Sequence, residues 1–537
     1  MIFDNINLKR GLNKILIYYL VLLAFIVILP FDDGKRKILL NLLVLSFLVI
    51  IIIPYVYSKS KIYSIDWYSN KSLLNKELRY DFRSKVFFYL KYLIFLLRDT
   101  VSDFYQDSVK WTEKNPLLIL AYFYLLAKMI AYNVLFSIVP YTDVFKKGGI
   151  YANQKQYFTG VLIADILGIP WDSVHYLEIA QKGYGGYDLA NWVFGPLYPY
   201  LIYQLNNLLN FIQDSSLGFI FDIIGISKAA GNFWALSAVL VANFFSFVAM
   251  IMFYKISLHY LDKKATNEEE KNHNKVKATL ATAVFIFFPT NFAYMTVAYS
   301  EPVFISFCLI AWYCFVMGRE KSTKGERTWY LYLAGISAAL ADLSRSPGIV
   351  LFGVLPMICA FYAFKYLYQQ NWQQSYIAFK DGIKVSIALT VPFLWGLFIS
   401  WHQIDTVALQ KNFWQQEIKI PWGGINYFLD KKPLPDVLPV FEFWGYVLLI
   451  FFLLLGAKKY SWELVFYSLA FFGLYTSVTG IGAYAIVRYL GSIWPAFLIF
   501  AEMDHKDTRP IVWAIIGLFY VLGMYWMTRW ALSLFWG

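Results

Sequence analysis

The sequence predicts an all-α, polytopic membrane protein. Apolar residues make up 59% of the 537 positions and aromatic residues 20%, a composition that soluble globular domains do not have. Apolar stretches of roughly 20 residues, the length that crosses a hydrocarbon core, recur from end to end. Helices follow, because an α-bundle satisfies its own backbone hydrogen bonds while an open sheet edge in lipid does not. We expect about 14 to 15 transmembrane helices with large non-cytosolic loops.

The balance of charge also fits a membrane protein. The 47 Lys and Arg residues exceed the 35 Asp and Glu residues, which gives a net charge of +12. Basic residues cluster in short loops between apolar stretches, as the positive-inside rule expects, so the sequence predicts no nucleic-acid partner. Cys308, Cys314 and Cys359 lie inside apolar segments without disulfide or zinc-ligand spacing, and we expect them to be small core residues.

The first part of the chain forms a separate region in this interpretation. Two apolar spans, at residues 15–30 and 38–57, form a hairpin, and the absence of a small-residue cleavage site favours a retained span over a signal peptide. Residues 58–115 mix basic, acidic and apolar positions and suit the cytosolic membrane interface. We therefore divide the chain into an N-terminal hairpin with a basic segment, 1–116, and a transmembrane module, 117–537.

Basic loops set the orientation of the transmembrane module. They are spaced by helix pairs and belong in the cytosol; their residues are 255–277, 319–327, 368–384, 458–459 and 505–509. Within the first of them, the charged run 266–277 predicts a solvated loop. The alternate segments face the other side, and they comprise residues 140–195, 299–301, 344–346, 402–435 and 483–489. Parity requires two crossings between 194 and 233, although the second, 217–226, is short for an ordinary span.

The stretch Trp171–Pro199 is a polar loop between apolar spans, rich in carboxylate, imidazole and aromatic groups. In a membrane protein, we expect chemistry in such a loop. Asp172 has two interpretations: a helix cap or interface residue, or a general base, which needs a carboxylate within hydrogen-bond reach of a hydroxyl. If residues 172–179 are helical, His175 lies near Asp172 on one face. His175 then either orients the base or contacts a phosphate, or it is a polar residue at headgroup level.

Glu178 would be a further ligand of a metal bound by this loop. It lies three residues beyond His175, which itself lies three residues beyond Asp172. A single Asp-His-Glu cluster without further ligands is poor support for a metal site. The sequence therefore predicts no metal and no cofactor, with binding of a divalent metal ion as the alternative.

Five motifs follow one another along the chain. They are Trp171-Asp172 with His175, Ile179, Ala180, Gly183 and Tyr184; Phe194-Gly195-Pro196-Leu197-Tyr198-Pro199; Tyr299-Ser300-Glu301; Arg345-Ser346-Pro347-Gly348; and Arg488-Tyr489. In this order they resemble the PIG-V-like mannosyltransferases, a family of GT-C membrane glycosyltransferases, over residues 117–503. Two positions depart from the family's pattern, since Gly195 stands where the family has an aromatic residue and Pro347 where it has Asn.

The resemblance implies an inverting glycosyltransferase with a GT-C-type helical bundle. It implies transfer of a sugar, with mannose expected, from dolichyl or polyprenyl phosphate to a hydroxyl of a lipid-linked or surface glycan or glycolipid. Asp172 and His175 are the expected catalytic residues, and one carboxylate suffices because inversion takes a single displacement. The expected substrate-binding or supporting residues are Trp171, Glu178, Tyr184, Tyr198, Tyr299, Glu301, His402, Trp414 and Glu417.

Two arginines are candidates for the donor's phosphate. Arg345 and Arg488 sit at expected helix ends among apolar residues, where a charge is costly without a partner. They either snorkel to the interface or bind phosphate, which a guanidinium matches with two parallel hydrogen bonds. Glu301, next to Pro302, has two interpretations: it caps its helix, or it orients Arg345 in an ion pair.

The late loop, residues 401–440, is long for a bundle connection and mixes aromatic with polar side chains. His402, Trp414, Glu417 and Trp422 belong to it. Aromatic faces bind sugar rings, but Trp and Tyr also gather at membrane interfaces for mechanical reasons. The aromatic residues of this loop therefore have two interpretations: they bind the acceptor, or they anchor the loop at the membrane interface.

Two other functions are weighed against an enzyme. A transporter or flippase of lipid-linked sugars would also be polytopic, but transporters tend to show internal repeats and interrupted helices, whereas the ionisable residues here sit mostly at span ends. A non-catalytic assembly partner would tolerate the loss of Asp172. We expect an integral protein of the plasma membrane, or of the endoplasmic reticulum in a eukaryote, with its active site on the non-cytosolic face.

Overall fold

The computed structural model describes most of the chain beyond residue 112. The described residues are 113–138, 162–185, 189–215, 218, 233–321, 323–414, 416–419, 423, 459–480, 486–503 and 509–531. The chain divides into two compact units, Met1–Ile119 and Leu120–Gly537. The expected division at 116/117 stays a prediction. The expected first hairpin lies outside the described residues, as does most of the short crossing at 217–226.

Helices dominate the described residues, and six stretches among them are long and apolar enough to cross a membrane. They comprise α5 (Pro116–Ile138), α12 (Trp234–Asp262), α15 (Glu301–Glu320), α17 (Ile349–Tyr368), α18 (Trp372–Ser386) continued through η6 (Ile387–Leu389) into α19 (Thr390–Trp401), and α25 (Arg509–Ala531). The prediction of a helical, multi-pass membrane protein is confirmed. The expected total of about 14 to 15 spans includes spans outside the described residues, so this number stays a prediction.

Shorter or more polar elements complete the described chain. They are α8 (Leu162–Gly168), α9 (Ser173–Lys182), η3 (Leu189–Val193), α10 (Leu197–Asp214), α13 (Glu268–Phe287), α14 (Pro289–Tyr294), α16 (Lys324–Ser344), η5 (Ser346–Gly348), α20 (Thr406–Trp414), α23 (Trp462–Ser477), η7 (Ile486–Ser492) and η8 (Trp494–Met503). Two short strands, β1 (Gln416–Ile418) and β2 (Val478–Gly480), pair antiparallel with Gln416 opposite Gly480. Part of the late loop is thereby held at the end of α23.

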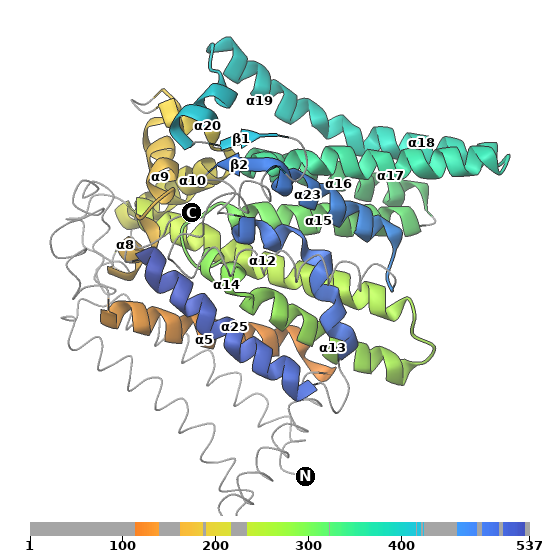
Figure 1. Ribbon diagram of the computed structural model, residues 1–537, viewed down its shortest axis with the longest axis horizontal. Coiled ribbons are helices and arrows are strands. Elements are labelled where there is room, and N and C mark those ends of the chain that lie inside the picture. The colour runs from red at the N-terminus through yellow and green to blue at the C-terminus, as the bar shows by residue number, and fades with distance from the viewer. Residues whose placement is uncertain are drawn as a thin grey trace, which may run out of the picture. The chain divides into compact units, whose positions relative to one another are not determined.

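α15 packs between α12 and α16, and the three helices run side by side (Figure 1). α18 packs on both α16 and α17. It approaches α16 closely, because a Cβ atom at Gly335 would lie only 2.3 Å from the Val385 carbonyl oxygen. Small residues allow such backbone contacts between membrane helices. α19 buries no side chain and exposes Phe393 and Leu394, as expected of a helix that faces lipid.

The core between α12, α15, α23 and η8 is aromatic. Trp312 and Trp494 are fully buried, with ring centroids 5.9 Å apart. Tyr467 lies 5.2 Å from Trp312 and 5.5 Å from Trp494, and the Trp312 indole donates to the Tyr260 hydroxyl at 3.2 Å. Aromatic pairs in such geometries contribute about 0.5–1.5 kcal/mol each beyond the area that they bury. This packing fixes α15, whose first residue is Glu301.

The run 266–277 is not the loop that its charges predict. α13 begins at Glu268, and Asn267 caps it by accepting a hydrogen bond from the Glu270 amide at 2.8 Å. Three glutamates in the first turn favour a helix there, because the helix dipole attracts negative charge at its N-terminus. Charge composition thus identifies the exposed first turn of α13 but not the helical backbone, and further along the run Asn274 and Val276 are buried. Residues 368–384 are likewise mostly helical, since only 369–371 separate α17 from α18.

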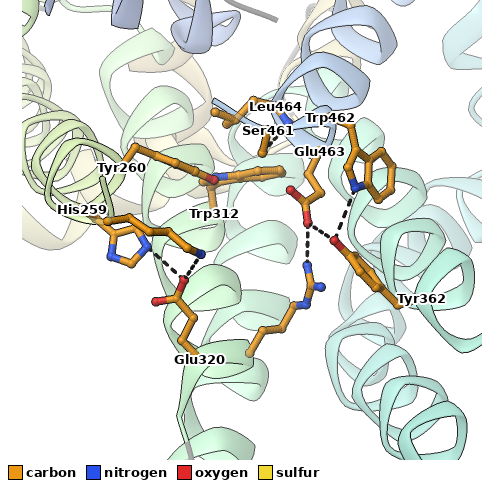
Figure 2. A network of polar contacts seen from close by, with 11 residues as sticks. His259, Tyr260, Trp312, Glu320, Tyr362, Ser461, Trp462, Glu463 and Leu464 are labelled. Carbon is orange, nitrogen blue, oxygen red and sulfur yellow. Dashed lines mark hydrogen bonds and ion pairs between the residues drawn. The ribbon is translucent and has the colours of Figure 1, made fainter. Parts of the chain in front are cut away.

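The C-terminal end of α15 is tied to neighbouring helices by a network of polar contacts (Figure 2). Glu463 of α23 accepts hydrogen bonds from Arg319 at 3.1 Å and from the Tyr362 hydroxyl of α17 at 2.8 Å. Glu320 pairs with Lys263, which follows α12, at 2.8 Å. The network therefore anchors α15 at the end opposite Glu301.

Replacing Glu463 by Gln is expected to lower thermal stability. Gln keeps the shape but loses the charge that pairs with Arg319, and a hydrogen bond to a charged group contributes about 1.5–3 kcal/mol. Thermal unfolding in detergent measures the change, with Glu269→Gln on the exposed first turn of α13 as the matched control. A Glu463→Gln protein that unfolds at the wild-type temperature would contradict the anchoring role of the network.

Candidate active site

Asp172 follows a residue with a strained backbone. Trp171 has a φ of 58°, in the left-handed region, which costs a bulky residue roughly 1–3 kcal/mol. Its indole nitrogen donates to the Trp530 carbonyl oxygen of α25 at 3.1 Å and so holds the turn. Asp172 occupies the N-cap position of α9 but makes no capping hydrogen bond with its side chain. Its carboxylate is therefore used elsewhere.

The Asp172 carboxylate belongs to a chain of ion pairs that joins four segments of the sequence. Arg488 Nη2 lies 2.9 Å from Asp172 Oδ2, and Arg488 Nε donates to Glu301 Oε1. Arg345 Nη1 lies 2.5 Å from the same oxygen of Glu301. The four segments are the residue before α9, the start of α15, the residue after α16, and η7. We call Asp172, Glu301, Arg345 and Arg488 the ion-paired cluster.

The ion-paired cluster is largely buried. The exposed fractions of the side chains are 17% for Asp172, 13% for Arg345, 6% for Arg488 and 3% for Glu301. The two carboxylates and two guanidinium groups compensate each other, and removing one partner of a buried pair typically costs about 3–5 kcal/mol. Asp172 is the most exposed member of the cluster.

Glu301 fits both of the interpretations that the sequence leaves open. It lies in the first turn of α15, where the helix dipole favours a carboxylate, and it also pairs with Arg345. Among the described residues, its Oε2 has no hydrogen-bond partner although the side chain is buried. Buried polar atoms without a partner are uncommon.

Two tyrosines pack on the ion-paired cluster. The guanidinium of Arg488 lies 4.7 Å from the ring centroid of Tyr299, within cation–π range. The Tyr299 hydroxyl accepts a long hydrogen bond from the Asp172 amide at 3.4 Å. Burial raises the pKa of Tyr299 well above its ordinary value, and the nearby Asp172 carboxylate acts in the same direction. The Tyr176 hydroxyl shares a hydrogen bond with Ser300 at 2.7 Å, which ties α9 to the start of α15.

His175 and Glu178 are joined through an asparagine. His175 Nδ1 lies 2.8 Å from Asn191 Oδ1, and the His175 ring stacks on Phe194 at 5.1 Å. The Asn191 amide nitrogen donates to Glu178 Oε2 at 3.1 Å. Asn191 is not part of any of the motifs. Its side chain is 1% exposed, and this burial, which suggests a structural role, is visible only in the structure. Within the described part of the chain, no group of three or more His, Cys, Asp and Glu side chains gathers as metal ligands.

Tyr184 and Tyr198 anchor the segment that follows α9. The Tyr184 hydroxyl donates to the Phe194 carbonyl oxygen at 2.7 Å, and its ring lies 5.1 Å from that of Trp192. Tyr198 is fully buried and donates to the Ala238 carbonyl oxygen of α12 at 2.9 Å. Both tyrosines hold the segment after α9 in place by donating hydrogen bonds to backbone carbonyl groups.

His402 lies against the same segment. Its ring centroid is 5.4 Å from that of Trp192 and 4.4 Å from that of Phe398, so the end of α19 meets η3. An open cavity of about 550 Å³ lies at the turn between α19 and α20, and its polar lining includes Ser400, Gln403, Asp405 and Thr406. The aromatic contacts of His402 and this polar depression thus both lie at the end of α19.

Glu417 has basic neighbours in the late loop. It pairs with Lys411 at 2.9 Å and with Lys419 at 3.5 Å. The hydrogen bond from Lys411 lowers the pKa of Glu417. The side chain of Trp414, at the end of α20, and all of Trp422 lie outside the described residues.

Gly195 departs from the family pattern, and close packing at this position explains why the residue is glycine. A Cβ atom there would lie 2.3 Å from the Leu343 carbonyl oxygen and 2.8 Å from the Ser344 carbonyl oxygen. An aromatic side chain does not fit at this contact. Glycine instead lets the turn before α10 lie on the end of α16, directly before Arg345.

Residues 265–408 match the family model described as dolichyl-phosphate-mannose-protein mannosyltransferase. The match covers less than half of the chain and includes Glu301 and Arg345, while Asp172 and Arg488 lie outside it. Over this segment the chain is thus similar to a family of enzymes that use dolichyl-phosphate mannose. The predicted glycosyltransferase activity of the whole protein is taken up as a proposal below. The PIG-V-like subfamily is not shown by the match.

Two solved structures are similar to the chain. One is ArnT from Cupriavidus metallidurans bound to undecaprenyl phosphate, with a TM-score of 0.41 and 12% identity over 68% of this chain and 61% of that one. The other is the archaeal oligosaccharyltransferase AglB from Archaeoglobus fulgidus in complex with an inhibitory peptide and a dolichol-phosphate, with a TM-score of 0.35 and 12% identity over 77% of this chain and 56% of that one. The chain thus spans about three fifths of the lengths of these proteins. No curated protein matches the sequence at a significant level.

A side chain at position 195 is expected to destabilise the protein and to lower its activity. Gly195→Ala places a methyl group against two backbone carbonyl oxygens and displaces the end of α16, and Gly195→Phe, the family-like residue, does so more strongly. Overpacking of this kind costs about 1–3 kcal/mol. The unfolding temperature measures the effect, and Gly185→Ala is the control, because a Cβ atom there meets nothing within 4 Å. Equal unfolding temperatures for the two alanine variants would refute the steric argument.

Proposed function

We propose that the protein transfers mannose from dolichyl or another polyprenyl phosphate to a hydroxyl of a lipid-linked or surface glycan, with inversion at the anomeric carbon. One observation carries the proposal: a partly exposed carboxylate and two guanidinium groups meet in the ion-paired cluster. A carboxylate can act as general base, and guanidinium groups bind phosphate. The matched family supports the choice of sugar and lipid. We place the cluster on the non-cytosolic face, opposite the basic helix ends.

Asp172 is the general base in this mechanism. The acceptor oxygen bonds to the anomeric carbon while the bond from that carbon to the phosphate oxygen breaks. The proton of the acceptor hydroxyl passes to Asp172, and the polyprenyl phosphate leaves with the electron pair. A single displacement of this kind needs one carboxylate. The exposure of Asp172, the largest in the cluster, fits its contact with the acceptor.

Arg345 and Arg488 hold the donor's phosphate. Both contact Glu301, and Arg488 also pairs with Asp172. A phosphate bound at these arginines takes over part of their hydrogen bonding and weakens the pairing of Arg488 with Asp172. Loss of a nearby positive charge makes a carboxylate a stronger base. Donor binding thereby prepares Asp172 for proton transfer.

The acceptor lies over η3 and the end of α19 in this proposal. Trp192, Phe398 and His402 supply aromatic faces, and the neighbouring cavity of about 550 Å³ supplies polar groups such as Gln403 and Asp405. Sites that combine aromatic walls with a few polar groups are typical of small-molecule recognition. His175 supports this surface by stacking on Phe194, which follows η3.

Asp172→Asn is expected to lower kcat for mannose transfer by about 10²–10⁴-fold, because it removes the base while keeping the shape. The donor KM is expected to change little. The assay is transfer of labelled mannose from dolichyl-phosphate mannose to a membrane lipid extract by purified protein, with a thermal-unfolding check. Glu269→Gln, far from the cluster on α13, is the control and should keep wild-type activity.

Equal transfer by wild type and Asp172→Asn would rule out the assigned base. No transfer by wild type, together with movement of labelled lipid across proteoliposomes, would instead support a flippase.

Arg345→Lys is expected to raise the donor KM about tenfold or more, because lysine cannot make two parallel hydrogen bonds to phosphate and such bonds contribute about 1.5–3 kcal/mol. The acceptor KM should stay unchanged. Arg488→Lys should raise the donor KM as well and also lower kcat, since Arg488 touches the base. Steady-state kinetics with varied donor and acceptor separate the two variants; an unchanged donor KM in folded Arg345→Lys would exclude this arginine from the phosphate site.

A further inference from the structure

Lys128 is a buried lysine in the middle of a candidate transmembrane helix. It lies in α5 and is 2% exposed. A charged side chain inside the membrane is costly, so such residues are usually retained for a function. Among the residues that the structure describes, Lys128 forms no ion pair, which distinguishes it from the arginines of the ion-paired cluster. Neither the motifs nor the proposed mechanism uses it.

The Lys128 amino group makes three hydrogen bonds. It donates to Asn243 Oδ1 at 2.6 Å and Ser246 Oγ at 3.0 Å, both on α12, and to the Met295 carbonyl oxygen at 3.0 Å. It also lies 4.3 Å from the ring centroid of Tyr124. The three acceptors match the three donors of an ammonium group. The amino group thus holds α12 and the residue after α14 together.

Met295 begins segment 295–300, which joins α14 to α15. The Thr296 carbonyl accepts a hydrogen bond from the Asn243 side chain at 3.1 Å, and the Ala298 carbonyl accepts one from Ser173 at 2.8 Å. Backbone without regular structure is tolerated in a membrane protein only where its polar groups find partners. Lys128 and Asn243 therefore fix the first half of this segment.

The second half of segment 295–300 reaches the ion-paired cluster. Tyr299 contacts both Asp172 and Arg488, and Glu301 follows directly. The path of the segment therefore decides where Tyr299 and Glu301 lie relative to Asp172. A displacement of about 1 Å at a reacting group can lower a rate about 100-fold.

We propose that Lys128 is a positioning residue for sugar transfer. By holding the Met295 carbonyl, and with Asn243 the start of segment 295–300, it keeps Tyr299 against Asp172 and Glu301 against Arg488. It acts through the protein and contacts neither donor nor acceptor. The inference rests on the function proposed above.

The first test is Lys128→Met, which keeps the apolar stem and removes all three hydrogen bonds. We expect kcat for mannose transfer to fall at least about tenfold, with donor and acceptor KM within about twofold of wild type. The unfolding temperature is expected to fall, because the buried Met295 carbonyl and the Asn243 and Ser246 side chains lose a hydrogen-bond donor. Amide hydrogen exchange should accelerate in segment 295–300. Lys324→Met, at the exposed start of α16, is the matched control.

Asn243→Ala is the second variant, since it removes one acceptor of Lys128 and the donor to Thr296 while the lysine stays in place. We expect a smaller fall in kcat and faster exchange in segment 295–300; if Lys128→Met does not fold, this variant decides. Wild-type kcat in either folded variant, or unchanged exchange in segment 295–300, would overturn the proposal. If wild type transfers no mannose from the lipid donor, the proposed function fails, and hydrogen exchange still decides whether Lys128 holds the segment.

Discussion

The buried carboxylate of Glu301 contacts two guanidinium groups, and the geometry of the site depends on this arrangement. Arg345 follows α16 and Arg488 lies in η7, so their convergence without Glu301 would bring two cations together in a largely buried place. Repulsion between like charges is strong where water is excluded. Glu301 therefore holds α15, α16 and η7 together and, through Arg488, brings in Asp172 at the start of α9.

α15 joins this site to the other end of the bundle. Its 20 residues span about 30 Å, close to the thickness of the hydrocarbon core. Glu301 at one end is held by ion pairs. Arg319 and Glu320 at the other end are also held by ion pairs, in the network of Figure 2, while aromatic side chains around Trp312 fill the part between. Polar contacts thus gather at the helix ends and apolar contacts in the middle, which is the arrangement that a membrane requires.

Composition alone is enough to predict the helical membrane fold, and the motifs are enough to select all four members of the ion-paired cluster. Each of them is an ionisable residue at the end of an apolar stretch, which is a local property. Their pairing is not local: Asp172 and Arg488 are 316 positions apart, and their contact depends on how several helices pack. Asn191 and Lys128 escape motif reasoning for a different reason, because their roles come from burial and from neighbours on other helices. The run 266–277 shows a further limit, since its charges report exposure while Asn267 and the helix dipole decide its conformation.

In the proposed mechanism, the ion-paired cluster receives the donor's phosphate next to Asp172. The decisive measurement is a structure of the protein with a non-hydrolysable donor analogue, a polyprenyl mannosyl phosphonate. We expect phosphonate oxygens about 3 Å from guanidinium nitrogens of Arg345 or Arg488, with the anomeric carbon facing the Asp172 carboxylate. A phosphonate bound away from both arginines, with the ion pairs of the cluster unchanged, would contradict this mechanism.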